Sequence, residues 1–263
     1  MNNLSFDYLS KYQNIFWMAT RTTLGLALFG VLIGTALGTL LALMRRSKWF
    51  FLRWPAVAYI EFMRGTPLLV QVTFAAFALP QLLNFKRGNA NYFSMGSVVL
   101  GLNSAAYIAE IIRSGIQSVD KGQMEAARSL GMGQGLAMRR IILPQAIKNI
   151  LPALGNEFVS VIKESSILNV LGVAELMYTA NRIGAATYTY FQPLIVISLI
   201  YFAMTFTLSK LLGVAERSMD RSRFRRRVMA QQAAEAELLE NQQSEAQSIG
   251  ATDSQKGSEN DGK

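Results

Sequence analysis

The sequence predicts an all-α, polytopic membrane protein with five transmembrane helices. Apolar residues make up 51% of the 263-residue chain and charged residues only 16%. A helix needs about 20 mostly apolar residues to cross the hydrocarbon core of a bilayer. Stretches of this length without a charged residue occur at 22–44, 65–85, 88–109 and 183–209. So many uncharged stretches in a short chain argue against an ordinary soluble protein.

One further predicted span, the fourth in chain order, is interrupted by charges. Residues 149–174 are largely apolar but contain Glu157, Lys163 and Glu164. Each charge near the centre of a membrane helix costs about 2.5–3.5 kcal/mol, so this segment cannot stand alone facing lipid. We expect it inside a helix bundle, with the charges turned toward partners or water. The five spans are predicted at about residues 21–44, 54–82, 90–113, 149–170 and 188–212.

The chain contains no cysteine and no histidine. Disulfides, thiolate metal sites and cysteine nucleophiles therefore cannot form. The usual catalytic triads and HExxH zinc sites cannot be built either. We expect no catalytic residues, no metal site and no cofactor.

The distribution of Lys and Arg predicts the orientation in the membrane. Basic residues cluster after the first, third and fifth predicted spans and are sparse in the other connections. By the positive-inside rule, the N-terminal segment 1–20 lies outside, in the periplasm or the extracellular space. The membrane domain is predicted at 21–215, with a cytoplasmic loop at 114–145. The cytoplasmic tail at 216–263 has too few apolar residues to bury and is expected to be partly disordered.

Small residues and prolines mark two features of the predicted bundle. Gly30, Gly34 and Gly38 recur every four residues on one face of the first span. Such spacing lets two membrane helices approach closely, and packing within the subunit is favoured over dimerisation. Pro67 and Pro152 each free a backbone carbonyl, which is tolerated where a broken helix is buried or lines a cavity.

The predicted cytoplasmic loop is too polar to cross the membrane and too long for a simple turn. It reads as two short helices, 121–130 and 136–143, around a glycine-rich break. Asp120 is a plausible N-cap, and Glu125 and Arg128 have the spacing of an ion pair. A DNA-binding helix–turn–helix is the rival interpretation, but a loop tethered between two spans cannot easily enter a major groove.

Four motifs carry a resemblance to a known family. The loop contains Glu125-Ala-Ala-Arg-Ser-Leu-Gly131 and then Ile142-Leu-Pro-Gln-Ala146. The other three motifs are Arg64-Gly-Thr-Pro-Leu-Leu-Val-Gln71, Asn103-Ser-Ala-Ala-Tyr-Ile-Ala-Glu110, and Leu151-Pro-Ala-Leu-Gly-Asn156 with Lys163-Glu-Ser-Ser166. The loop resembles the EAA loop of binding-protein-dependent ATP-binding-cassette (ABC) importers. The other motifs resemble the permeases that import polar amino acids, and together they cover roughly residues 20–215.

The resemblance implies a five-span, type I ABC importer permease in a bacterial cytoplasmic membrane. Two such permease subunits, as a homodimer or with a similar partner, would form the pore. Two ATPase subunits and an extracytoplasmic solute-binding protein would be separate chains. The residues that would dock on the ATPase are Glu125, Ala126, Ala127 and Gly131. The chain has no GxxxxGK[ST] phosphate loop, so it is not expected to bind ATP, and no nucleic-acid partner is expected.

Charges inside a membrane are candidates for function because they are costly. Glu61 and Arg64 are expected to pair with each other at the cytoplasmic end of the second span. Glu110 and Arg113 are expected to do the same in the third. Both pairs are assigned a structural role.

The candidate substrate pathway lies in the fourth span and comprises Asn156, Glu157, Ser160, Lys163 and Glu164. An amino acid needs an acceptor for its ammonium group, which Glu157 and Asn156 could supply, and donors for its carboxylate, such as Ser160. The alternatives are a salt bridge of Lys163 with Glu164 and a Glu157 that only lines the subunit interface.

The expected substrate is a polar or basic amino acid: glutamine, glutamate, arginine, histidine or lysine. A carboxylate at Glu157 favours the cationic substrates. The competing function is an ion-coupled secondary carrier, which would need no ATPase. A membrane scaffold and a membrane enzyme are less favoured.

Overall fold

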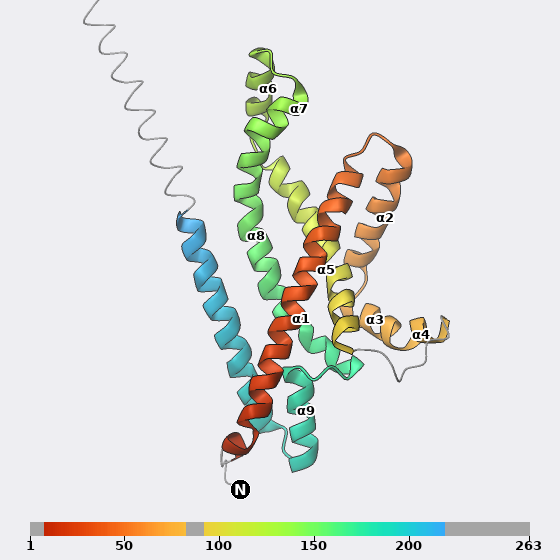
Figure 1. Ribbon diagram of the computed structural model, residues 1–263, viewed down its shortest axis with the longest axis vertical. Coiled ribbons are helices and arrows are strands. Elements are labelled where there is room, and N and C mark those ends of the chain that lie inside the picture. Colours follow the sequence, from red (N-terminus) through yellow and green to blue (C-terminus); the bar gives the residue numbers. More distant parts are fainter. Residues whose placement is uncertain (1–7, 83–91, 219–263) are drawn as a thin grey trace, which may run out of the picture. The chain divides into compact units, whose positions relative to one another are not determined.

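The computed structural model describes residues 8–82 and 92–218 (Figure 1). Predictions that fall on 1–7, 83–91 and 219–263 lie outside the described residues, including nearly all of the predicted tail. The chain divides into two units, Met1–Gly213 and Val214–Lys263, and only the first five residues of the second are described. Within the described ranges the secondary structure is helical, with no strand, as predicted.

The helices have the following bounds. They are α1 (Tyr8–Arg45), α2 (Phe50–Gly65), α3 (Leu68–Thr73), α4 (Leu79–Leu82), α5 (Tyr92–Gln117), α6 (Lys121–Ser129), α7 (Gln134–Ala137), α8 (Leu143–Glu164) and α9 (Leu176–Thr187). The π-helical segments η1 (Phe74–Ala78) and η3 (Met138–Ile142) and the 3₁₀ segment η4 (Ser165–Leu171) join some of them. The last described helix is Phe191–Ser218.

Three described helices are long and apolar enough to cross a membrane. They are Lys11–Arg45, Tyr92–Gln117 and Phe191–Ser218, which contain the predicted first, third and fifth spans almost completely. A bent pair, Phe50–Gly65 with Leu68–Leu82, makes a fourth span if it is counted as one. Helix α8, which carries the four charged residues Lys148, Glu157, Lys163 and Glu164, is not among these helices. The total of five spans therefore stays a prediction.

The predicted span at 54–82 is broken at Pro67, the residue that the sequence analysis marked as a break. Its two halves are bent by 104°. Thr66 and Pro67 at the bend are both extended, with ψ angles of 141° and 138°. A residue before proline is disfavoured in the helical conformation, and proline cannot donate to the carbonyl four residues earlier. The Gly-Thr-Pro sequence therefore ends α2 and starts a helix in a new direction.

The Gln71 side chain replaces the hydrogen bond that Pro67 cannot make. Its amide nitrogen donates to the Met63 carbonyl oxygen at 2.9 Å, which is the acceptor four residues before the proline, and to Thr66 Oγ1 at 2.9 Å. The amide oxygen accepts from Asn103 Nδ2 of α5 at 3.0 Å. Backbone polar groups in a membrane must be satisfied within the protein. Gln71 thus stabilises the bend and ties it to α5.

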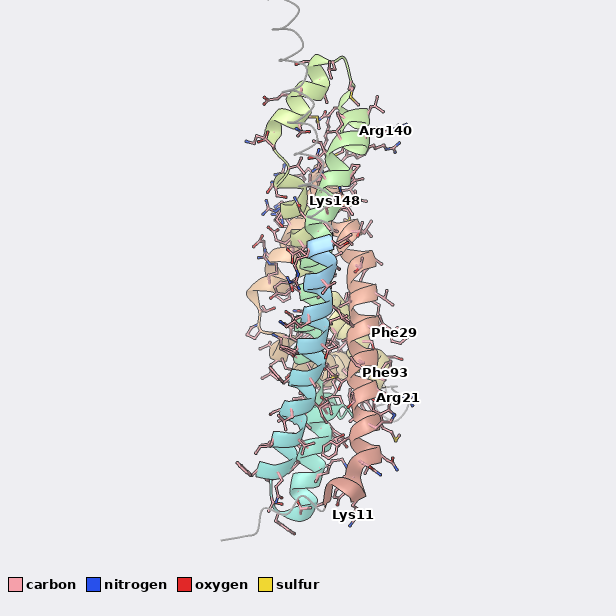
Figure 2. All side chains as sticks on the ribbon, turned by 90° about the vertical axis from the view of Figure 1, so that its left-hand side faces the viewer. Lys11, Arg21, Phe29, Phe93, Arg140 and Lys148 are labelled. Carbon is pink, nitrogen blue, oxygen red and sulfur yellow. The ribbon has the colours of Figure 1, made fainter. Side chains whose placement is uncertain are left out.

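Helix α1 packs closely along α5 through the predicted glycines. A Cβ at Gly34 would lie 3.0 Å from Ser104 Cβ, and one at Gly38 would lie 2.7 Å from the Ala105 carbonyl oxygen. Farther along the seam, Phe29 and Phe93 meet edge to face with ring centroids 5.9 Å apart (Figure 2). The expected use of this stripe for packing within the subunit is confirmed.

Two features were not predicted from the sequence. Helix α9 follows α8 and η4, where only a connection was expected. The second short helix of the loop is not separate, because α7, η3 and α8 follow one another without a break in helical structure from Gln134 to Glu164. One π-helical turn, with the Leu143 N–H donating to the Met138 carbonyl oxygen, marks the junction.

Replacing Gly38 by alanine is expected to destabilise the protein by about 1–3 kcal/mol, since the new methyl group would meet backbone and side-chain atoms of α5. Thermal unfolding in detergent measures the change. Gly213→Ala is the control, because a Cβ there meets nothing within 4 Å and alanine favours the helix. Equal unfolding temperatures for the two variants would contradict the tight seam.

Gln71→Leu is expected to cost about 1–3 kcal/mol, because the Met63 carbonyl and the Asn103 amide lose their partner. Chemical unfolding in detergent checks it. The matched control is Gln13→Leu, at an exposed position of α1. A loss no greater than that of the control would show that the bend does not depend on this side chain.

Candidate functional site

Helix α6 lies with α7 at one end of α5 and α8, at the opposite end from α9 (Figure 1). Asp120 caps it as predicted, its carboxylate accepting from the Gly122 N–H at 2.7 Å. The Gln145 side chain of α8 reaches back to Gln123 of α6 at 3.3 Å. The short helix is therefore attached to α8 as well as to the end of α5.

Gly131 ends α6 by adopting a left-handed conformation with φ of 80°. Its N–H donates to the Arg128 carbonyl oxygen at 3.0 Å, and the Met132 N–H donates to the Ala127 carbonyl oxygen at 3.1 Å. These two bonds form a Schellman motif, in which a non-glycine residue would be strained. The local role of Gly131 is to stop the helix and turn the chain toward α7.

The predicted docking residues of α6 divide into two faces. Glu125 and Ala126 are exposed, whereas Ala127 is 2% exposed and faces the protein. Leu130 at the end of the helix is 83% exposed, an apolar neighbour that the sequence analysis did not select. Within the described residues no ion pair joins Glu125 to Arg128, so that predicted contact is wrong. Glu125 is left on the outer surface.

The predicted pathway residues of α8 also divide into two groups. Asn156 and Lys163 are exposed, while Glu157, Ser160 and Glu164 are half-buried. Glu157 and Glu164 lie two helical turns apart on the more buried side of α8. The structure thus does not bring the five residues into one cluster.

Glu157 is held by a residue that the sequence analysis did not assign. Ser104 Oγ of α5 donates to a carboxylate oxygen of Glu157 at 2.7 Å. Ser104 is also the residue against which Gly34 of α1 packs. The carboxylate therefore lies where α1, α5 and α8 meet. The only sequence signal for Ser104 was its place in the motif that begins at Asn103.

Glu110 is the centre of the charged cluster at the other predicted site. Arg113 pairs with it as predicted, with Nε 2.9 Å from its carboxylate. Arg45, the last residue of α1, binds the second carboxylate oxygen at 2.8 Å. Arg64 lies 3.8 Å from Glu110, so the expected Glu61–Arg64 pair is replaced by a contact to α5. The cluster joins α1, α2 and α5, which supports its structural assignment.

Glu175, which the sequence analysis overlooked, is fully buried just before α9. Its carboxylate accepts from the N–H groups of Met177 and Tyr178, at 2.8 and 2.6 Å, and from the Tyr201 hydroxyl at 3.0 Å. Burial raises the pKa of this carboxyl to about 7, although the three donors act in the opposite direction. Its signal in the sequence was weak, because Glu175 falls in a connection where a charge is expected to be solvated.

Relatives of known description support the family resemblance. The chain is 43% identical over 197 residues to the arginine transport system permease protein ArtQ of Bacillus subtilis, covering 75% of this chain and 89% of the relative. It is 40% identical over 217 residues to the putative glutamine transport system permease protein GlnP of Rickettsia conorii, covering 81% and 98%.

Solved structures agree with these relatives. A crystal structure of an amino acid ABC transporter with histidines contains a chain of 49% identity with a TM-score of 0.77, covering 82% of this chain and all of the other. The MetNI methionine ABC transporter, at 18% identity and a TM-score of 0.58, shares the fold. A family model described as the inner membrane component of binding-protein-dependent transport systems matches residues 34–221. The chain belongs to this family of ABC-transporter permeases, the multi-pass inner-membrane components of binding-protein-dependent transport systems.

Proposed function

We propose that the chain forms the translocation pathway of an ATP-driven importer of polar or basic amino acids. The observation that carries the proposal is the position of Glu157 on α8. Helix α8 is continuous with η3 and α7, and a short turn joins α7 to the exposed helix α6. A partner that moves α6 would thereby move the helix that carries the half-buried carboxylate of Glu157.

The proposed substrate follows from chemistry and from the relatives. Glu157 supplies a hydrogen-bonded carboxylate within the helix bundle, which suits an ammonium or guanidinium group. The relatives are named for arginine and for glutamine transport. Asn156 and Lys163 lie on the exposed side of α8, where they are available to a substrate or to a second permease subunit. Both relatives fit the predicted range of amino acids.

The proposed partners occupy both sides of the membrane. Two ATPase subunits dock on α6 in the cytoplasm, through Glu125 and Ala126. Ala127 packs α6 against the rest of the protein, and Gly131 ends the helix. A second permease subunit completes the pore, and an extracytoplasmic binding protein delivers the substrate. The C-terminal end of α1, which Arg45 closes and the basic residues Arg46 and Lys48 follow, lies toward the same end of the fold as α6 (Figure 1). This supports an N-terminus outside and a cytoplasmic α6.

Chemical energy must come from the ATPase partners in this proposal, because the sequence lacks a phosphate loop of its own. The chain is therefore proposed to be a transporter subunit and not an enzyme. No observation on the described residues favours a secondary carrier, and the family relationship argues against one.

Glu125→Lys is expected to lower ATP-driven uptake at least tenfold, because it reverses a charge on the proposed docking face of α6. Uptake into proteoliposomes and copurification of the ATPase measure the effect. Glu216→Lys makes the same substitution at another exposed helical position and should transport normally. Normal uptake and normal copurification of Glu125→Lys would refute the docking assignment.

Glu157→Gln is expected to reduce uptake of arginine and lysine about tenfold or more, and to affect glutamine less, since only the cations lose a charged partner. Competitive uptake of the labelled amino acids measures the preference. Ser104→Ala is the control, because it removes the hydrogen bond and keeps the carboxylate. An unchanged preference in Glu157→Gln, or an equal loss for all three amino acids, would contradict substrate contact.

A further inference from the structure

Residues 46–54, which comprise the connection after α1 and the first residues of α2 and are called the turn below, expose large aromatic side chains. The exposed fractions are 67% for Trp49, 68% for Phe50, 71% for Phe51 and 63% for Trp54. The rings lie close to each other, with centroids 6.3 Å apart for Trp49 and Phe51 and 6.5 Å apart for Phe50 and Trp54. A contiguous exposed aromatic surface requires an apolar or interfacial partner. Tryptophan is enriched at the level of lipid headgroups.

Three basic residues share this turn with the aromatic rings. Arg46, Lys48 and Arg53 are all exposed. Arg45, just before them, is bound to Glu110. By contrast, no acidic side chain of residues 8–82 and 92–218 lies within ion-pairing distance of Arg46, Lys48 or Arg53. The sequence contains no Asp or Glu at all from residue 8 to residue 60, so the turn has no acid of its own.

The opposite end of α1 offers a contrast. Trp17 is also exposed, at 61%, but the nearby cation is used within the helix: Arg21 lies over the Trp17 ring with its guanidinium carbon 5.5 Å from the centroid. Lys11 likewise lies over Tyr12 at 5.6 Å. Figure 2 shows Lys11 and Arg21 along this part of α1. Exposed rings occur at both ends, but only at the turn do the cations lack a partner within the described residues.

We propose that the turn at 46–54 binds anionic phospholipid, with the phosphate-bearing headgroup held by Arg46, Lys48 and Arg53 and the acyl boundary packed on the four aromatic rings. A basic residue near a bilayer attracts anionic headgroups, and three together make a selective surface. The aromatic rings fix the depth of the turn, so the cations sit in the headgroup layer. In the proposed orientation this is the cytoplasmic leaflet, but the lipid preference itself does not depend on transport.

The experiment uses the tryptophans of the protein as probes. The chain has three, so Trp17→Phe leaves only Trp49 and Trp54, both in the turn. The full chain is placed in phosphatidylcholine bilayers that contain an equal small fraction of either brominated phosphatidylglycerol or brominated phosphatidylcholine. Quenching of the fluorescence gives the relative binding constant of the two lipids. We expect a preference for phosphatidylglycerol of at least about fivefold, which is the increase in binding that one basic residue near the surface produces.

Neutralising the three cations in this background, with Arg46→Gln, Lys48→Gln and Arg53→Gln, should reduce the ratio to about one. Arg46→Lys with Arg53→Lys keeps the charge and should retain the preference, which separates a loss of charge from a loss of folding. Lys11→Gln with Arg21→Gln, at the other end of α1, should leave the ratio unchanged. If the neutral variant does not fold, high salt applied to the Trp17→Phe protein should lower the ratio.

Two results would overturn the proposal. Equal quenching by both brominated lipids in the Trp17→Phe protein would show that the turn is an aromatic anchor without lipid preference. A preference that survives neutralisation of the three cations, or high salt, would place the anionic lipid elsewhere. Neither result would affect the proposed transport function, which is measured by uptake.

Discussion

The close approach of α1 to α5 is the contact on which the rest of the described fold depends. Because the glycines of α1 have no side chain, the backbone of α5 and Ser104 can approach the backbone of α1 directly. Ser104 then reaches Glu157 of α8 from the same position, and Asn103 beside it holds the bend through Gln71. Helix association in lipid relies on such close packing and on interhelical hydrogen bonds, because apolar side chains gain little by leaving lipid tails. Widening this one seam would therefore disturb α8 and the bend together.

Hydropathy and spacing predicted the features that depend on a single segment. The three uninterrupted spans, the glycine stripe and the Asp120 cap of α6 were all visible in the sequence. The 104° bend was not, because an apolar run reports the length of a helix and not its direction. Pro67 indicated a break. The direction of the chain after the break depends on Gln71 and Asn103, which lie 32 residues apart in two separate motifs, and nothing in the sequence indicated that they are in contact. Helix α9 was missed because it is too short and too mixed to resemble a span.

The candidate site shows the same limit. Glu157 could be selected from its cost in a membrane, but its partner Ser104 could not, since a serine among small residues is typical of any packed helix. The five candidates of α8 were selected for their charge or polarity and grouped by their spacing along the helix. Spacing does not say which side of α8 faces α5, and the structure places Asn156 and Lys163 on a different side from Glu157. Arg64 likewise contacts Glu110 of α5 instead of its sequence neighbour Glu61, because α2 packs against α5.

The continuity of α7, η3 and α8 connects the surroundings of α6, the proposed docking helix, to the half-buried carboxylate of Glu157. The turn at Gly131 separates α6 from this continuous helix, but the hydrogen bond between Gln123 and Gln145 links α6 to α8 directly. The hydrogen bonds along the helix then carry a displacement along its axis. The π-helical turn at Met138–Ile142 and Pro152 within α8 are irregularities in that continuous helix, and π-helical turns often occur at functional sites. Beyond Glu164 the helix tightens into η4 and ends at Gly172, whose φ of 82° closes the segment. A displacement of α6 would thus reach α8 through the Gln123–Gln145 hydrogen bond as well as through the turn at Gly131, and the buried Glu175 network would hold the far end against α1 and the last helix.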